Sequence, residues 1–238
     1  MELDGIKVVT AQEMRDIENR CLQKGYSELE FMQQAGVSIS RQVEKFIQER
    51  GLPKEVLLFA GKGNNAGDGF CVGAILVTKG YSVIAYPIYP VEQFGALCRN
   101  MYENFCAQGG KIEFSLEKIR ERMNHGGLIL DALVGTGMKK SADNELASAI
   151  KIANCSKLPI LAIDIPSGLN GTTGEVRSIA IHATKTIYLE LAKTGFFLRD
   201  GWDHVGEIVR GSFGLQEDAT VASACLLDCS SLKLPPIQ

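Results

Sequence analysis

Apolar residues recur with the period of an amphipathic helix in two stretches near the start of the chain. Thr10 followed by Glu13 is a capping box, and it predicts a first helix that runs to about Lys24. Gly25 is the expected stop, and Ser27 is expected to start a second helix. The apolar face of that second helix is expected to carry Leu29, Met32, Ala35, Gly36 and Ile39.

From Glu55 onward, apolar runs of strand length alternate with amphipathic stretches of helix length. The expected strands are Val56–Ala60, Ser82–Ile88, Lys111–Glu113, Gly127–Asp131, Pro159–Ile163, Thr184–Leu189, Gly206–Val209 and Ala222–Leu227. The expected helices are Asp68–Lys79, Phe94–Gln108, Leu116–Met123 and Asn144–Asn154. This alternation predicts an α/β fold, a Rossmann-like three-layer sandwich in which helices cover both faces of a mostly parallel sheet.

The chain of 238 residues contains no linker or repeat, so residues 1–238 are expected to form a single domain. A helical N-terminal extension is expected at about residues 8–50 and an α/β core at about residues 54–230. The net charge of −3 leaves no broad basic face for nucleic acid. No apolar run approaches the roughly 18 residues of a membrane helix, so we expect no membrane partner.

The seven cysteines are scattered and include no Cys-x-x-Cys pair, which favours reduced thiols in the cytoplasm. The acidic start of the chain predicts no signal or transit peptide, and a mitochondrial location is the alternative if a transit peptide has been removed. His125, His182 and His204 lack the spacing of metal ligands, and we interpret them as structural or surface residues.

Three loops are expected at the carboxyl ends of the parallel strands, where ligands bind in such sheets. They are Gly61–Gly67, Ala132–Ser141 and Asp164–Gly174. The first lies in the stretch FAGKGNNAGDG, and its spacing fits the dinucleotide fingerprint G-x-G-x-x-A. The second strand of that fingerprint should end in an acid, whereas Val83–Pro87 contains none. A glycine-rich turn at a helix N-terminus still suits a phosphate, and a plain tight turn is the alternative.

Side-chain oxygens are concentrated in the same three loops. Asp131 and Asp164 each end an apolar strand, while Asn65 and Ser167 lie in the adjoining turns. Oxygen ligands select hard cations rather than zinc or copper. Because the set holds few carboxylates, potassium is as plausible as magnesium.

Several motifs together resemble the YjeF N-terminal domain family. Its three signatures are matched by Asn64-Asn65-Ala66-Gly67-Asp68-Gly69, Asp131-Ala132-Leu133-Val134-Gly135-Thr136-Gly137 and Asp164-Ile165-Pro166-Ser167-Gly168-Leu169-Asn170. Further matches are Phe31–Gly36, Thr184–Leu189 and Lys193–Gly195. The matches follow the family's order along nearly the whole chain. The resemblance implies an NAD(P)H-hydrate epimerase, which interconverts the R and S forms of hydrated NADH or NADPH.

The resemblance also implies a set of site residues. Those expected to bind the hydrated nucleotide are Asn64, Asn65, Ala66, Gly67, Asp68, Gly135, Thr136, Gly137, Met138, Lys139, Lys140, Ser141 and Asp164. A potassium ion is the expected cofactor, with Asn65, Asp131 and Ser167 as its ligands. Asp164 is the expected catalytic residue, alternating as acid and base while water leaves the substrate and returns to its other face.

The chain departs from the family pattern at Ala66, where the usual residue is glycine. We expect Ala66 to keep an ordinary backbone conformation, because Gly63, Gly67 and Gly69 can supply unusual angles. Gln33 also departs from the pattern.

The resemblance implies a functional link to an NAD(P)H-hydrate dehydratase and a homodimer joined through the N-terminal helices. Leu234-Pro235-Pro236 resembles the lead-in to a fused dehydratase domain, and it also suits the end of a stand-alone domain. The alternatives in other functional classes are a non-catalytic binding scaffold of the same fold and a dehydrogenase. The preference between the two hydrates stays open.

Overall fold

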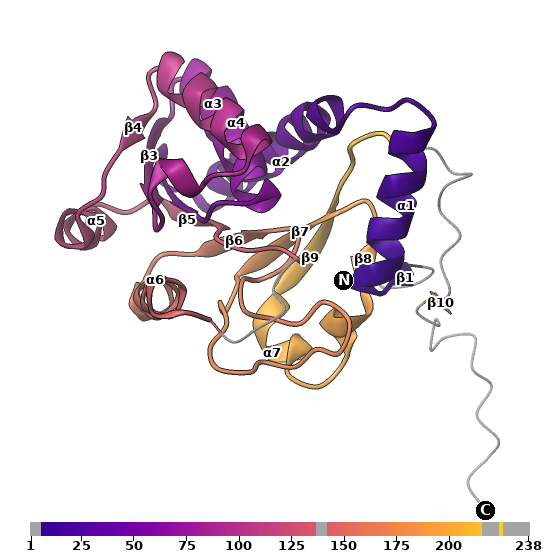
Figure 1. Cartoon of the computed structure of the whole chain (residues 1–238). Helices are drawn as coiled ribbons and strands as arrows, with labels where there is room; N and C mark the ends of the chain where they lie inside the picture. Colours follow the sequence, from indigo (N-terminus) through magenta and orange to yellow (C-terminus); the bar gives the residue numbers. More distant parts are fainter. Residues whose placement is uncertain (1–5, 137–141, 216–223, 226–238) are drawn as a thin grey trace, which may run out of the picture.

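The structure is a computed structural model that describes residues 6–136, 142–215 and 224–225 (Figure 1). Its α-helices are α1 (Ala11–Gln23), α2 (Glu28–Arg50), α3 (Asn64–Thr78), α4 (Ala96–Ala107), α5 (Leu116–Met123), α6 (Asn144–Cys155) and α7 (Gly201–Val205). Its strands are β1 (Lys7–Val9), β2 (Glu55–Ala60), β3 (Ser82–Pro87), β4 (Lys111–Ile112), β5 (Leu128–Ala132), β6 (Ile160–Ile163), β7 (Lys185–Leu189), β8 (Ala192–Lys193), β9 (Glu207–Gly211) and β10 (Ala224–Cys225).

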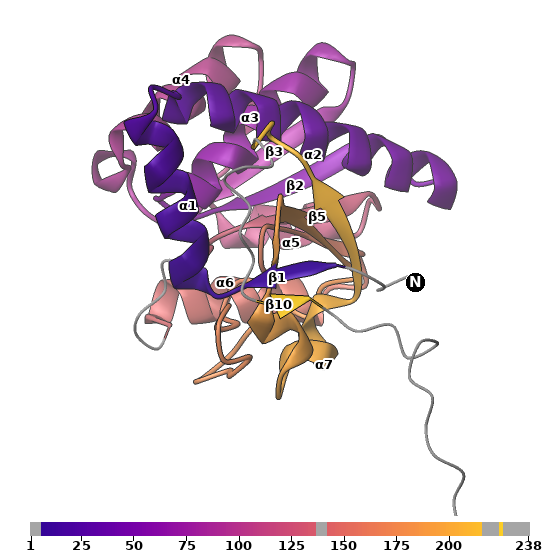
Figure 2. The ribbon, with the colours of Figure 1, turned by 90° about the vertical axis from the view of Figure 1, so that its right-hand side faces the viewer.

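A seven-stranded sheet with the order β4-β3-β2-β5-β6-β7-β9 forms the centre of the molecule, and its strand pairs are parallel. The chain adds β3 and β4 on one side of β2 and then continues with β5 on the other side. The strand order therefore reverses between β2 and β5, and such a switch point is where ligands bind in open α/β sheets. A second sheet of order β10-β1-β8 lies next to α1, with β1 and β10 side by side (Figure 2).

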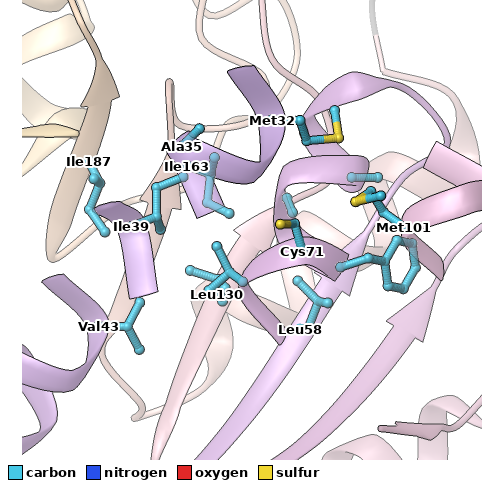
Figure 3. Close-up of a cluster of buried hydrophobic side chains, with 14 of the residues drawn as sticks. Met32, Ala35, Ile39, Val43, Leu58, Cys71, Met101, Leu130, Ile163 and Ile187 are labelled. Carbon is cyan, nitrogen blue, oxygen red and sulfur yellow. The ribbon is translucent and has the colours of Figure 1, made fainter. Parts of the chain in front are cut away.

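Helices cover both faces of the large sheet, because alternate residues of each strand point to opposite sides. Leu58 of β2 packs in a cluster with residues of α2, α3 and α4, whereas Leu57 packs in a cluster with residues of α5 and α6. Figure 3 shows side chains of α2 pointing toward those of the strands, among them Ile39, Val43, Leu130 and Ile163. The predicted three-layer α/β fold is confirmed.

The predicted helix starts and burial are confirmed in most places. Thr10 caps α1, and its side chain and that of Glu13 make the reciprocal hydrogen bonds of a capping box. Leu29 is the exception on α2, since it is 37% exposed while the other members of the predicted face are buried. Leu29 lies in the first turn of the helix, beyond the part that packs on α3 and the sheet.

Several short elements were not predicted, namely β1, β8 and α7, because two to five residues carry too little periodicity to identify an element. Of the predicted strand at residues 222–227, only β10 lies within the described residues, and it joins the small sheet rather than the large one. None of the helices in the described ranges is both long and apolar enough to span a bilayer.

The described cysteines are free thiols, as predicted. Cys21, Cys71 and Cys98 are buried, whereas Cys155 is exposed. Cys225 and Cys229 have no described side chain. The rings of His182 and His204 stack with centroids 4.1 Å apart, which agrees with a structural role for both.

Candidate active site

The glycine-rich turn after β2 lies at the switch point and is held against the loop after β5. Gly61 N donates a hydrogen bond to Ala132 O (3.1 Å). A Cβ atom at Gly61 would lie 1.8 Å from Leu133 O, so a side chain does not fit there. Glycine is needed at this position to bring the two loops together.

Helix α3 begins at Asn64, four residues before the predicted start at Asp68. Gly63 is the N-cap, and no side chain caps the helix. The first N–H groups of α3, on Asn64, Asn65 and Ala66, therefore have no partner within the helix. Together with the helix dipole, they form a site that favours an anionic group such as a phosphate.

Ala66 has an ordinary helical conformation, which confirms the prediction that it is unstrained. The reason given for it was wrong, because Gly63, Gly67 and Gly69 also have no positive φ. Gly67 and Gly69 are required for close packing instead. A Cβ at Gly69 would lie 2.5 Å from Ala132 Cβ, and one at Gly67 would lie 2.8 Å from Met32 Cε.

Asn65 points into the protein from the first turn of α3. The residue is buried, and its side-chain Nδ2 and Oδ1 have no hydrogen-bond partner. It lies against the loop after β5, since a Cβ at Gly135 would be 3.5 Å from Asn65 Cβ. A buried amide without a partner costs free energy, so a polar ligand at this position would restore the missing interactions.

Asp131 and Ser167 come from neighbouring strand ends and bond directly to each other. Asp131 Oδ1 accepts hydrogen bonds from Ser167 Oγ (2.6 Å) and Leu133 N (3.2 Å), and Oδ2 accepts one from Ser167 N (2.9 Å). Both residues are fully buried. Burial raises the pKa of Asp131 to about 6, although the hydrogen bonds from Ser167 and Leu133 lower it.

Asp164 follows β6 and has a left-handed backbone with φ of +64°. Its Oδ1 lies 2.5 Å from Lys193 Nζ and accepts a hydrogen bond from Leu189 N (3.3 Å). The side chain of Lys193 is only 1% exposed, and that of Asp164 is 15% exposed. Among the described residues no donor reaches Asp164 Oδ2, so this oxygen is available to a ligand. A left-handed non-glycine residue is a form of strain that is often found at functional sites.

Two further carboxyl groups interact electrostatically with this ion pair. Burial raises the pKa of Asp68 well above its ordinary value, and the nearby carboxylates of Asp164 and Glu18 raise it further. Burial also raises the pKa of Glu18 to about 7, while Lys193 lowers it. The environment therefore favours the protonated form of Asp68, whereas Asp164 forms an ion pair with Lys193.

The structure thus brings most of the described candidates to one edge of the sheet. Gly135 lies beside Asn65, and Thr136 lies near the loop after β6, because a Cβ at Gly171 would be 3.6 Å from Thr136 Cγ2. Asn64 is exposed at the start of α3. The remaining predicted nucleotide ligands lie outside the described residues: Gly137, Met138, Lys139, Lys140 and Ser141.

Lys193 and Glu18 were not predicted as site residues. Lys193 directly follows the apolar residues Leu191 and Ala192. This position is a weak signal that the lysine is buried and paired with an acidic residue. Glu18 lies on the polar side of α1, where the sequence offers no signal. Its place near Asp68 and Lys193 depends on how α1 packs.

Chemically, the edge combines a proton donor with a fixed negative charge. Burial raises the pKa of Asp68 well above its ordinary value, and Asp164 forms an ion pair with Lys193. Two carboxyl groups in such different environments are the usual basis for dividing the roles of acid and base.

The family model described as YjeF-related protein N-terminus matches residues 28–195. An NAD(P)H-hydrate epimerase of Lentilactobacillus buchneri is 32% identical over 217 residues, which cover 88% of this chain and 95% of that protein. A protein of the same name from Elusimicrobium minutum is 28% identical over 218 residues, covering 90% of this chain and 98% of that protein.

Larger proteins match over part of their length. The bifunctional NAD(P)H-hydrate repair enzyme Nnr of Moorella thermoacetica is 29% identical over 217 residues, which cover 88% of this chain and 41% of that protein. The crystal structure of yeast ynu0 superposes with a TM-score of 0.74 at 20% identity, covering 86% of this chain and 87% of that one, and it supports the fold. The chain therefore belongs to the family described as YjeF-related protein N-terminus.

Proposed function

We propose that this protein is an epimerase that interconverts the R and S forms of hydrated NADH and NADPH. Membership of the family and similarity to relatives named NAD(P)H-hydrate epimerase support this proposal. The observation that carries it is the pair of carboxyl groups at the sheet edge. Asp164 forms a buried ion pair with Lys193, whereas burial raises the pKa of Asp68 well above its ordinary value.

The substrate carries a hydroxyl group on the carbon next to the ring nitrogen, so it is a hemiaminal. When the hydroxyl group receives a proton, the carbon–oxygen bond breaks, water leaves, and the ring becomes a planar iminium cation. Water that adds to the opposite face and loses a proton gives the other epimer. The reaction therefore needs a proton donor, a proton acceptor and a negative charge near the cation.

Asp68 and Asp164 fit these needs. The protonated Asp68 donates to the departing hydroxyl group, and the free Oδ2 of Asp164 faces the cation and accepts the proton of the returning water. A proton then passes back to Asp68, directly or through water, and the cycle closes. Lys193 fixes the position of Asp164 through a buried ion pair. Asp164 thus remains the catalytic residue of the proposal, with Asp68 as its partner.

The phosphates are proposed to bind the unpaired N–H groups of Asn64, Asn65 and Ala66 at the start of α3. Gly135 and Thr136 face this position from the loop after β5.

A potassium ion is proposed to bind between Asn65, Asp131 and Ser167. The residues fit such an ion, because the buried amide oxygen of Asn65 lacks a partner and Asp131 and Ser167 supply further oxygens. The ion would supply a fixed positive charge beside the nucleotide. One carboxylate in the set suits a monovalent cation better than a divalent one.

The bifunctional relatives support a functional link between this protein and an NAD(P)H-hydrate dehydratase. We also propose that the protein forms a homodimer and is located in the cytoplasm.

Incubation of the purified protein with a single epimer of hydrated NADH tests the proposal. Chromatographic separation of the two epimers should show a rapid approach to equilibrium from either side. An approach no faster than in buffer alone would contradict the proposed activity and favour a binding scaffold.

A further inference from the structure

A cavity of about 430 Å³ opens at the carboxyl end of β3, outside the site described above. It is lined largely by aromatic residues and prolines, including Tyr86, Tyr89, Phe114 and Pro87. Of the described residues that line it, Glu92 alone carries a charge. Small-molecule sites have volumes of roughly 300–1,000 Å³ and combine apolar walls with a few polar groups, and this cavity has both properties.

Lys62 connects the cavity to the glycine-rich turn. Its Nζ lies 4.2 Å from the centre of the Tyr89 ring and 3.0 Å from Gln93 Oε1. Its backbone oxygen accepts a hydrogen bond from Gly95 N (3.0 Å). The same residue thus belongs to the turn that precedes α3 and contacts the wall of the cavity.

The two tyrosines that line the cavity are held in place by contacts with neighbouring elements. Tyr89 Oη donates a hydrogen bond to Asp143 Oδ2 (2.7 Å), and Asp143 is the N-cap of α6. Tyr86 packs edge-on against Phe59, with ring centroids 5.4 Å apart. Phe114, by contrast, follows β4 and is 59% exposed. An exposed phenylalanine beside ordered aromatic rings leaves a flat apolar surface for a planar ligand.

The position of the cavity along the sheet edge is informative. In a dinucleotide fold the ribose next to the adenine lies at the end of the second strand, which is β3 here. From β3 the order of strands runs through β2 and β5 to β6, so three strand spacings, or about 14 Å, separate Pro87 from the end of β6. The start of α3 lies between these two points. A base, a pyrophosphate and a second base therefore match the cavity, the start of α3 and Asp164 in order.

We infer that the cavity at Tyr86, Tyr89 and Phe114 binds the adenine base of the dinucleotide, stacked against Phe114. The inference rests on the proposed function for the identity of the whole ligand. Lys62 places its positive charge between the base and the phosphates. The adenine half then anchors the substrate at β3 while the nicotinamide half reacts at Asp164.

The first test measures binding of ADP by titration calorimetry, which does not depend on catalysis. Phe114→Ala should weaken ADP binding by about tenfold, because base stacking on one aromatic side chain contributes about that much. Phe114→Tyr should retain wild-type affinity within twofold. Trp202→Ala is the matched control, since Trp202 is 57% exposed on α7 and should leave ADP binding unchanged. Failure of the wild type to bind millimolar ADP, or equal affinities in wild type and Phe114→Ala, would overturn the inference.

The second test uses the reaction. Phe114→Ala should raise KM for hydrated NADH about tenfold and leave kcat unchanged. With hydrated reduced nicotinamide mononucleotide, which lacks the adenylate half, the variant and the wild type should have the same KM. An equal rise in KM for both substrates would overturn the inference. If the proposed activity is wrong, the wild type will epimerise neither substrate, while ADP binding that depends on Phe114 will still be observed.

Discussion

Asp131 and Asp164 occupy similar places in the sheet, yet their surroundings differ. Each lies at the carboxyl end of a buried parallel strand. Asp131 accepts three hydrogen bonds in regular backbone, is fully buried and contacts no cationic side chain within the described part of the chain. Asp164 has a left-handed backbone, pairs with Lys193 and keeps one oxygen available. The comparison indicates that hydrogen bonds fix Asp131 between the strand ends, beside the proposed potassium ion, whereas Asp164 is arranged to meet the substrate.

The largest effect on activity is expected from Asp164→Asn. The amide is isosteric but cannot take a proton, so the rate of epimerisation should fall about a hundredfold or more. The free energy of unfolding should fall by about 3 kcal/mol, because the buried ammonium group of Lys193 loses its counter-charge even though Oδ1 can still accept hydrogen bonds from Lys193 and Leu189. Stopped-time assays and urea titrations of the same preparation measure both quantities. A variant with near-normal rate would remove Asp164 from the chemistry.

Asp131→Ala tests the other half of the comparison, because its largest effect should be on stability rather than on the rate of epimerisation. The variant leaves the N–H groups of Ser167 and Leu133 buried without their acceptor. The free energy of unfolding should fall by about 2–3 kcal/mol. Ser167→Ala is the milder comparison, since it removes one hydrogen bond of the set and should cost about 1 kcal/mol. Wild-type stability in Asp131→Ala would show that the contact between the strand ends contributes little.

Replacement of sodium by potassium at constant ionic strength should raise Tm by about 2–4 °C at pH 8, which corresponds to about 1 kcal/mol of binding free energy. The pKa of Asp131 is raised to about 6, so its favourable contribution to stability is present below pH 4 and is lost as the pH rises through 6. A bound cation offsets this loss of stability only at pH values at which Asp131 is ionised. The effect of potassium should therefore be smaller at pH 5.

Asn65→Ala supplies the control for the ion, since it removes the unpartnered amide without touching Asp131. The response of Tm to potassium should become smaller in this variant. Superimposable melting curves for the wild type in the two salts would contradict the proposed ion site.

The smallest effect is expected from Ala66→Gly, which restores the usual family residue. Ala66 is helical, so glycine adds freedom to the unfolded chain and should lower the free energy of unfolding by about 0.5–1 kcal/mol. Thermal melting at constant salt measures the change. A clear rise in Tm would indicate strain at Ala66 that its backbone angles do not show.

The sequence predicted the sheet, its helices and the meeting of Asp131 with Ser167, because apolar runs and strand-end positions are local signals. The early start of α3 was missed, since Gly63, Asn64 and Asn65 are weak helix formers. Tertiary packing fixes the start of α3 instead. The close approach of Gly61 to Leu133 and of Gly69 to Ala132 holds the residues between them in place.

The charged part of the site was harder to predict. Lys193 reaches Asp164 from β8, a strand of two residues that follows the left-handed residue Glu190. Glu18 reaches the same cluster from α1, which is far away in sequence. Contacts of this kind depend on tertiary packing, and no local pattern of apolar and polar residues encodes them.

Isotope transfer tests the central claim most directly, namely that Asp164 and Asp68 act through the loss and return of water. One epimer of hydrated NADH is incubated with the protein in water enriched in oxygen-18, and the other epimer is isolated early and analysed by mass spectrometry. Asp164→Asn provides the background of uncatalysed exchange. The account predicts one labelled oxygen in each molecule of the new epimer, formed at a rate well above that background. A new epimer that keeps its original oxygen would contradict the account.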